Sequence, residues 1–150
     1  MAKGGSIGSA LDSLAPLVVR LPLGLIFMAH GSQKLFGLFG GPGVSATLKS
    51  FEEKMGIPPI LTILAMIAEF GGGLGVLLGC LTRLSAFGIA CVMAVAIYKV
   101  TWVNGFFMNW SCLPGRGHGI ECNLALFGMA LSLVFSGGGR WALDRMLWRR

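Results

Sequence analysis

The chain has 150 residues, of which 55% are hydrophobic and 12% are charged, and its mean hydropathy is +0.78. Soluble proteins carry about 25% charged residues, so this composition excludes an ordinary soluble domain and indicates an integral membrane protein. A net charge of +6 would suggest nucleic-acid binding in a soluble protein. Here the basic residues lie in short loops and tails, where they set membrane orientation, and no nucleic-acid partner is expected.

Apolar segments close to the length of a membrane-spanning helix recur along the chain. They cover residues 15–38, 59–80, 84–103 and 120–136. The predicted fold is an all-α membrane four-helix bundle that forms a single domain over residues 1–150. Because Arg20, His30 and Lys34 interrupt the first segment and no cleavage site follows it, we expect this helix to remain in the mature protein.

Basic residues are divided unequally between the two ends of this bundle. The termini and the turn at 82–83 hold Lys3, Arg83, Arg140, Arg145, Arg149 and Arg150, whereas the other two loops hold Lys49, Lys54 and Arg116. The positive-inside rule therefore predicts that both termini are cytoplasmic. The chain is expected to be a multi-pass protein of the cell inner membrane, with the lipid bilayer as its first partner.

Two features describe the connections and the helix faces. The loop at 39–58 contains a segment that is predicted to form a short amphipathic helix on the membrane, and Gly56 and Pro58 would end it. Small residues recur at every fourth position in three helices, which is typical of close helix packing. They are Gly71, Gly75 and Gly79; Ala86, Ala90 and Ala94; and Gly128, Ser132 and Ser136. Packing within the chain is the plain interpretation, and a homo-oligomer interface is the alternative.

Glu69 is the one charged residue in the segment 59–80. It follows Pro59 by about ten residues, which places it roughly 15 Å deep, near the bilayer midplane. A charge at that depth costs at least about 2.5 kcal/mol on the lenient insertion scale. Glu69 should therefore face the protein interior, take up a proton or pair with a cation.

Polar residues on the other helices could meet Glu69. His30 and Lys34 are four residues apart and share one face of the first helix, with Arg20 on nearly the same stripe. We predict an outward-facing polar pocket in which Glu69 and His30 are the candidate catalytic residues. The candidate cofactor-binding residues are Arg20, Lys34, Tyr98, Lys99, Glu121 and Asn123. The plainer alternative is that the basic side chains only reach toward the membrane interfaces.

Cys112 and Cys122 bracket the last outer loop, whose glycines and proline let its ends approach. A disulfide between them is the first interpretation for an oxidising exterior. A redox-active dithiol or a metal site with His118 is the alternative, but it would supply only three ligands, so no metal is expected. His30 is the only histidine in the apolar segments, so a ligand pair for haem is lacking.

Several motifs together resemble the DoxX family of small four-helix membrane proteins. They are Arg20 with Gly24; Ala29–Gly37; Glu69–Gly75 with Leu78–Arg83; Glu121; and Gly137–Asp144. The resemblance implies a link to quinone-coupled oxidation of sulfur compounds and to membrane oxidoreductase complexes. We therefore expect a membrane subunit of a quinone-linked oxidoreductase system, with a quinone as the cofactor. Its carbonyls need donors and its reduction needs protons, which Glu69 or His30 could relay.

A different class of function is open as well. The chain could be a non-catalytic accessory or scaffold subunit that packs against a larger respiratory or oxidoreductase membrane complex. A transporter is a third interpretation, although the sequence shows no evident inverted repeat. Motifs for nucleotide binding and serine hydrolysis are absent, so any chemistry requires a bound molecule or another subunit.

Overall fold

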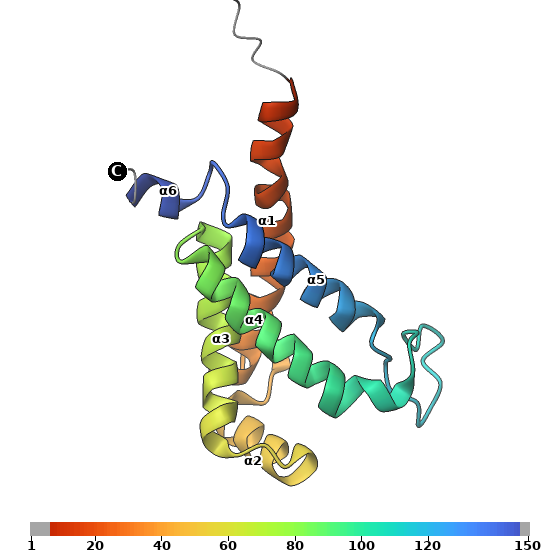
Figure 1. Cartoon of the computed structure of the whole chain (residues 1–150). Coiled ribbons are helices and arrows are strands. Elements are labelled where there is room, and N and C mark those ends of the chain that lie inside the picture. The colour runs from red at the N-terminus through yellow and green to blue at the C-terminus, as the bar shows by residue number, and fades with distance from the viewer. Residues whose placement is uncertain (1–6, 148–150) are drawn as a thin grey trace, which may run out of the picture.

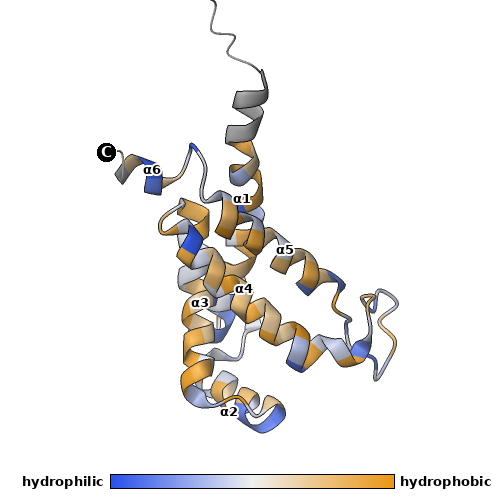
Figure 2. Ribbon diagram, in the orientation of Figure 1, coloured by the Kyte–Doolittle hydropathy of each residue, from blue (hydrophilic) through white to orange (hydrophobic). Residues whose placement is uncertain are grey.

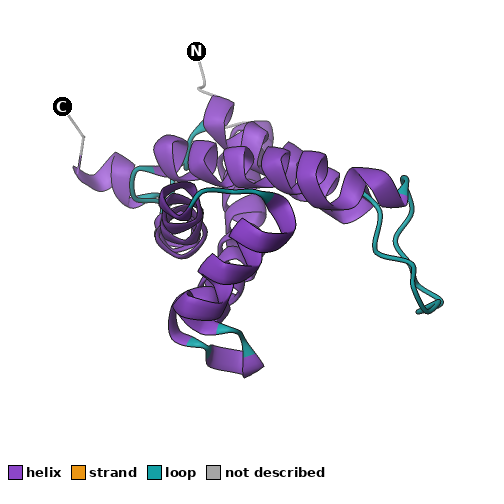
Figure 3. Cartoon of the chain, turned by 90° about the horizontal axis from the view of Figure 1, so that it is seen from below, coloured by secondary structure: helices purple, strands orange, loops and turns teal. Residues whose placement is uncertain are grey.

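A computed structural model describes the backbone of residues 7–147 and the side chains of residues 14–146. Every regular element in this part of the chain is a helix, as Figure 3 shows. The long helices are α1 (Ile7–Phe36), α3 (Pro59–Leu78), α4 (Thr82–Ala96) and α5 (Glu121–Ser136), and the shorter ones are α2 (Gly43–Met55) and α6 (Leu143–Leu147). The predicted all-α fold is confirmed.

The apolar helices match the predicted segments with shifted ends. Three stretches are long and apolar enough to cross a membrane: Leu14–Phe36, Pro59–Leu78 and Thr82–Asn104. Helix α5 is apolar but shorter, with 16 residues. Figure 2 shows the apolar colour along all four. The third stretch continues beyond α4 through the π-helical turn η2 (Ile97–Thr101) and the 3-10 turn η3 (Trp102–Asn104). A multi-pass membrane protein is therefore the correct class.

The helices form two pairs that cross (Figure 1). Helices α1 and α3 run side by side, and α4 and α5 form a second pair that runs diagonally to the first. The pairs meet near the end of the molecule that carries Ile7 and α6, and they diverge toward the end that carries α2. This divergence leaves one half of the bundle open.

Close approach of α1 and α3 depends on glycines. A Cβ atom added to Gly73 would lie 2.6 Å from the Met28 amide nitrogen, and one added to Gly24 would lie 2.8 Å from the Gly73 carbonyl oxygen. Real Cβ atoms do not sit at such distances, so only glycine permits this spacing. Small residues let membrane helices approach closely, and here they bring the two backbones into direct contact.

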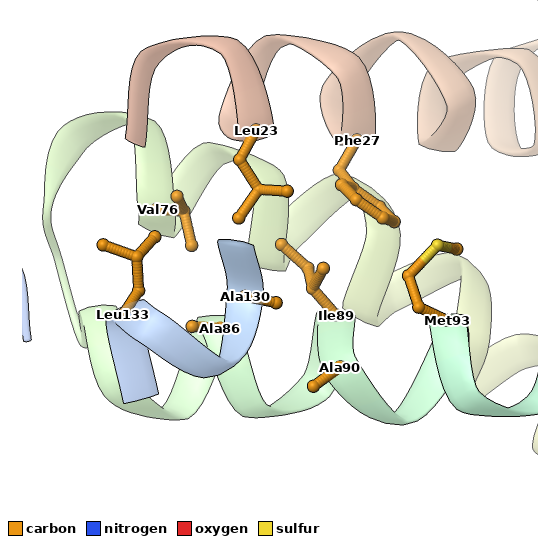
Figure 4. Packing of buried hydrophobic residues seen from close by; sticks show 9 residues of the cluster. All are labelled: Leu23, Phe27, Val76, Ala86, Ile89, Ala90, Met93, Ala130 and Leu133. Atoms are coloured by element: carbon orange, nitrogen blue, oxygen red, sulfur yellow. The ribbon is translucent and has the colours of Figure 1, made fainter. Parts of the chain in front are cut away.

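The apolar core occupies the end where the pairs converge (Figure 4). It consists of Leu23 and Phe27 from α1, Val76 from α3, Ala86, Ile89, Ala90 and Met93 from α4, and Ala130 and Leu133 from α5. The predicted small-residue seams contribute Ala86 and Ala90 to it, whereas Gly71, Ala94 and Gly128 face outward. Packing within the chain thus accounts for part of the seams.

Helix α2 is the short helix that the sequence predicted within residues 39–58. It packs against α1 and α3, and its Thr47 side chain is buried, with the hydroxyl donating to the Gly43 carbonyl at 2.6 Å. Gly56 ends it in a left-handed conformation with φ of 63°, as the sequence predicted. Helix α2 therefore lies against α1 and α3, with its other side chains half-buried or exposed.

The loop before α5 is closed by hydrogen bonds and not by a disulfide. Cys112 and Cys122 are both free and exposed, so the predicted disulfide between them is wrong for this structure. Asn109, which is buried, donates to the carbonyls of Leu113 at 3.0 Å and Arg116 at 2.8 Å and accepts from the Leu113 amide at 3.0 Å. The Asn109 amide thus closes the turn over residues 109–116, and backbone bonds from Gly119 and Ile120 to Phe107 and Gly105 join the ends of the loop.

Candidate functional site

A cleft of about 920 Å³ opens where the two helix pairs diverge. Its walls come from α1, α3 and α4, while α2, η2 and the start of α5 form the rim. The lining is mainly apolar. Its polar side chains are His30, Lys34, Glu69, Lys99 and Asn123. The structure therefore brings together five of the eight residues that the sequence placed in a polar pocket.

Lys34 and Glu69 form an ion pair across α1 and α3, with the Lys34 ammonium donating to Glu69 Oε1. The pair exists because the helices touch: a Cβ atom on Gly31 would lie 2.5 Å from the Phe70 amide nitrogen. Lys34 follows Gly31 by one helical turn and Glu69 directly precedes Phe70, so the same backbone contact brings the two charged side chains together. The predicted pairing of the buried carboxylate with a cation is present.

The two partners are not equally exposed. The Glu69 side chain is 4% exposed and the Lys34 side chain is 23% exposed. Within the described residues, Glu69 Oε2 is the buried side-chain oxygen or nitrogen that has no hydrogen-bond partner. Glu69 is thus the more deeply buried partner and has one unused acceptor, and the Lys34 ammonium is the more accessible charge of the pair.

An aromatic residue of α2 completes the surroundings of this lysine. Lys34 Nζ lies 5.6 Å from the centre of the Phe51 ring, within the range of a cation–π interaction. On the α1–α3 side, Phe36 and Phe70 pack edge to face with their ring centres 5.2 Å apart. The ammonium is therefore held between a carboxylate and an aromatic face.

The remaining polar lining residues lie on different walls. His30 is exposed on α1, one turn before Lys34. Lys99 reaches the cleft from η2, and Asn123 reaches it from the first turn of α5, where its amide donates to the Thr101 hydroxyl at 3.3 Å. These three side chains surround the apolar interior with hydrogen-bonding groups.

Two predicted site residues lie elsewhere. Tyr98 is 77% exposed and is not among the residues that line the cleft. Glu121 Oε2 accepts a hydrogen bond from the Met108 amide at 3.1 Å, so this carboxylate anchors the outer loop. Both expectations were wrong, since depth along a helix does not fix the direction of a side chain.

Arg20 is also separate from the cleft, at the end that carries α6. It is 1% exposed, and its guanidinium donates to the carbonyls of Val76 at 2.7 Å, Leu77 at 2.8 Å and Gly138 at 2.9 Å. These bonds cap the carboxyl end of α3 and hold the segment after α5 against it. Arg20 therefore has a structural role and not the cofactor-binding role that was predicted.

Asp144 completes this structural cluster. Its carboxylate accepts from the amides of Leu81 at 2.6 Å and Thr82 at 2.8 Å and from the Thr82 hydroxyl at 2.7 Å, which caps the start of α4. Burial alone would raise the pKa of this carboxyl. The bonds from Thr82 and Leu81, together with the charge of Arg20, outweigh burial and lower the pKa from its ordinary value.

Some lining residues were not anticipated from the sequence. They are Phe51 and Met55 of α2, Ile57 after it, and Cys91 of α4. Phe51 and Met55 are four residues apart, so their shared helix face was a usable signal. That face was assigned to the membrane surface, because the sequence alone does not show whether lipid or protein covers it.

Comparisons with known proteins agree with the membrane class. Residues 15–102 match the DoxX family. The chain is 28% identical over 143 residues to the inner membrane protein YqjF of Escherichia coli (strain K12), covering 91% of this chain and 95% of that protein. It is 32% identical over 140 residues to the uncharacterized membrane protein Rv3486 of Mycobacterium tuberculosis (strain ATCC 25618 / H37Rv), covering 89% and 82%. No solved structure matches the chain.

Proposed function

Because this chain belongs to the DoxX family, with a cleft that holds one ion pair among apolar walls, we propose that it is a membrane subunit of a quinone-linked oxidoreductase system. In this proposal the cleft holds the quinone headgroup, and the outer side of the cell inner membrane is where the cleft opens. The E. coli relative carries the name of an inner membrane protein, which supports that location.

The partly buried ammonium of Lys34, which lines the cleft, is the observation that carries the proposal. An ammonium has three donors, and Glu69 Oε1 uses one of them. A quinone carbonyl would accept another, while its flat ring would pack on apolar walls and aromatic side chains such as Phe51. A bound quinone supplies reversible two-electron, two-proton chemistry. The donor set and the size of the cleft fit such a headgroup.

Glu69 and His30 have separate tasks in this proposal. Glu69 orients Lys34, and its unpartnered Oε2 is an acceptor for a proton held close to the site. His30 lines the cleft one turn away, where its imidazole is the second group able to accept or donate a proton. Both residues therefore remain candidate proton carriers.

The exposed apolar residues of the cleft walls favour a ligand that enters from the lipid. Leu61 and Leu64 on α3 and Val95 on α4 line the cleft and are 52%, 54% and 47% exposed. Leaving such surface in water costs roughly 25 cal/mol per Å², whereas lipid chains or an apolar tail cover it at no such cost. A ligand with its headgroup at Lys34 and its apolar tail across these three residues would match both the charged part and the apolar part of the cleft.

Binding of decylubiquinone to the purified protein in lipid nanodiscs tests the proposal. We expect saturable quenching of tryptophan fluorescence, weakened about tenfold by Lys34→Met, which removes a charged hydrogen bond worth about 1.5–3 kcal/mol. Lys49→Met is the matched control, because Lys49 forms an exposed ion pair with Glu53 on α2, outside the cleft. Its binding curve should match that of the parent.

The alternative function, a non-catalytic accessory subunit, predicts the opposite result in the quinone-binding experiment. If the parent protein shows no saturable quinone binding, and gentle purification yields stable partner subunits without lipophilic molecules, then a scaffold role replaces the redox role. Mass spectrometry of the co-purified proteins and lipids separates these two outcomes.

A further inference from the structure

We infer that the cleft selects a headgroup that carries negative charge, and that Lys99 is the residue that sets this selectivity. The inference rests on the proposed function, because it refines the class of ligand that the same cleft takes. The ligand class is a lipophilic ring acid, such as a quinone with an ionised ring hydroxyl, whose tail remains in the membrane.

The charges of the cleft do not balance. Lys34 and Glu69 neutralise each other, and Glu69 is the one carboxylate among the lining residues. Lys99 adds a second cation, and no described carboxylate forms an ion pair with it. Among its lysines and carboxylates, the lining therefore has two cations and one anion. A bound anion would restore neutrality.

Lysines supply most of the charge in the lining. Glu69 also lines the cleft, but its side chain is only 4% exposed and one of its oxygens is paired with Lys34. Lys34 and Lys99 approach the cleft from α1 and from η2, which belong to different helix pairs. An anionic oxygen between them would accept hydrogen bonds from one or both ammonium groups.

Lys99 is an exposed cation with no described carboxylate partner. It lies in the third membrane-spanning stretch, Thr82–Asn104, on a π-helical turn of a kind often found at functional sites. Its ammonium is 5.9 Å from the centre of the neighbouring Tyr98 ring, which is its described aromatic contact. Ionisable residues within membrane helices are rare and usually face a partner, a cavity or a pathway. The cleft is that cavity.

A matched pair of ring compounds isolates the effect of charge. A 3-alkyl-2-hydroxy-1,4-naphthoquinone is an anion at neutral pH, and its 2-methoxy ether is a neutral molecule of nearly the same shape. Both are titrated by tryptophan quenching into protein in nanodiscs of a zwitterionic lipid, with empty nanodiscs correcting for partition. We expect the parent to bind the anion about tenfold more tightly than the ether.

Variants at Lys99 identify the source of the preference. Lys99→Met should bring the two affinities to within about twofold of each other, and Lys99→Arg should keep the parent preference, because it keeps the charge. Lys49→Met should keep it as well, since that lysine lies outside the cleft. The thermal unfolding temperature of each variant in detergent shows whether it is folded before it is titrated.

The outcomes separate this inference from the proposed function. Equal binding of anion and ether by the parent overturns the charge preference and leaves quinone binding intact. A preference that survives Lys99→Met shows that Lys99 only reaches toward the membrane interface, and it also overturns the inference. If neither compound binds to the parent, the proposed function fails together with it.

Discussion

Gly31 of α1 lies directly against the backbone of Phe70 of α3, and this contact sets the distance at which Lys34 meets Glu69. A Cβ atom on Gly31 would lie 2.6 Å from the Phe70 Cα atom as well as 2.5 Å from its amide nitrogen. Both neighbours are backbone atoms, which cannot rotate away. The ion pair of the cleft thus depends on a residue that has no side chain.

Gly31→Ala should separate α1 from α3 and destabilise the protein by about 1–3 kcal/mol, as overpacking of an interior does. Loss of the Lys34–Glu69 contact should accompany the loss of stability. Gly128→Ala is the control, because Gly128 lies within α5 with open space around its Cα atom. It should be neutral or stabilising. Thermal unfolding in detergent measures both, and equal effects of the two would refute the close-packing argument.

Glu69→Gln should lower stability by about 3–5 kcal/mol, because it leaves the Lys34 ammonium without its counter-ion at a largely buried site. The double variant Lys34→Met with Glu69→Gln should recover part of this loss. Unfolding of the parent, both single variants and the double variant forms a complete cycle. A coupling free energy near zero would mean that the two side chains do not stabilise each other.

Asp144→Asn should weaken the junction between α6 and the start of α4 at neutral pH. The pKa of Asp144 is lowered in the folded state, so its carboxylate stabilises the fold above the ordinary aspartate range, about pH 4. This contribution is lost as the pH falls through the folded-state pKa. The difference in unfolding temperature between parent and variant should therefore shrink on acidification. A difference that stays constant with pH would contradict the assignment.

Asn109→Ala should open the loop before α5, because the amide makes three hydrogen bonds to the backbone of Leu113 and Arg116. Each buried group left unpaired costs about 1–3 kcal/mol. Limited proteolysis should cut the variant faster at Arg116. Ser111→Ala, an exposed change in the same loop, should leave the rate unchanged. Equal rates for Asn109→Ala and the parent would show that the loop is closed by other means.

Orientation can be tested with single cysteines placed at Lys49 and at Arg116 in a variant that lacks the four native cysteines. An impermeant thiol reagent added to intact spheroplasts should label both positions, since we expect the cleft and its two adjoining loops on the outer side. A cysteine at Arg83, at the opposite end of the bundle, is the control and should react only after lysis. Labelling of Arg83 alone would place the cleft on the cytoplasmic side.

The sequence by itself determined the class of fold and identified one buried charge that needs a partner. Apolar length specifies a membrane helix almost directly, because the bilayer requires about 20 apolar residues and satisfied backbone hydrogen bonds. The same argument singled out Glu69, since a carboxylate at mid-membrane depth needs a cation. The structure supplies that cation as Lys34.

Tertiary structure alone decided which residues share a site. Arg20 and Lys34 lie on one stripe of α1, yet 14 residues of helix place them roughly 21 Å apart along the axis. Arg20 binds carbonyls at the closed end, while Lys34 faces the cleft. Helix periodicity gives the face of a residue, but the crossing of the two helix pairs determines where the bundle is open. Within one of these pairs, the contact of α1 with α3 depends on glycines that meet a segment distant in sequence, which no local pattern reports.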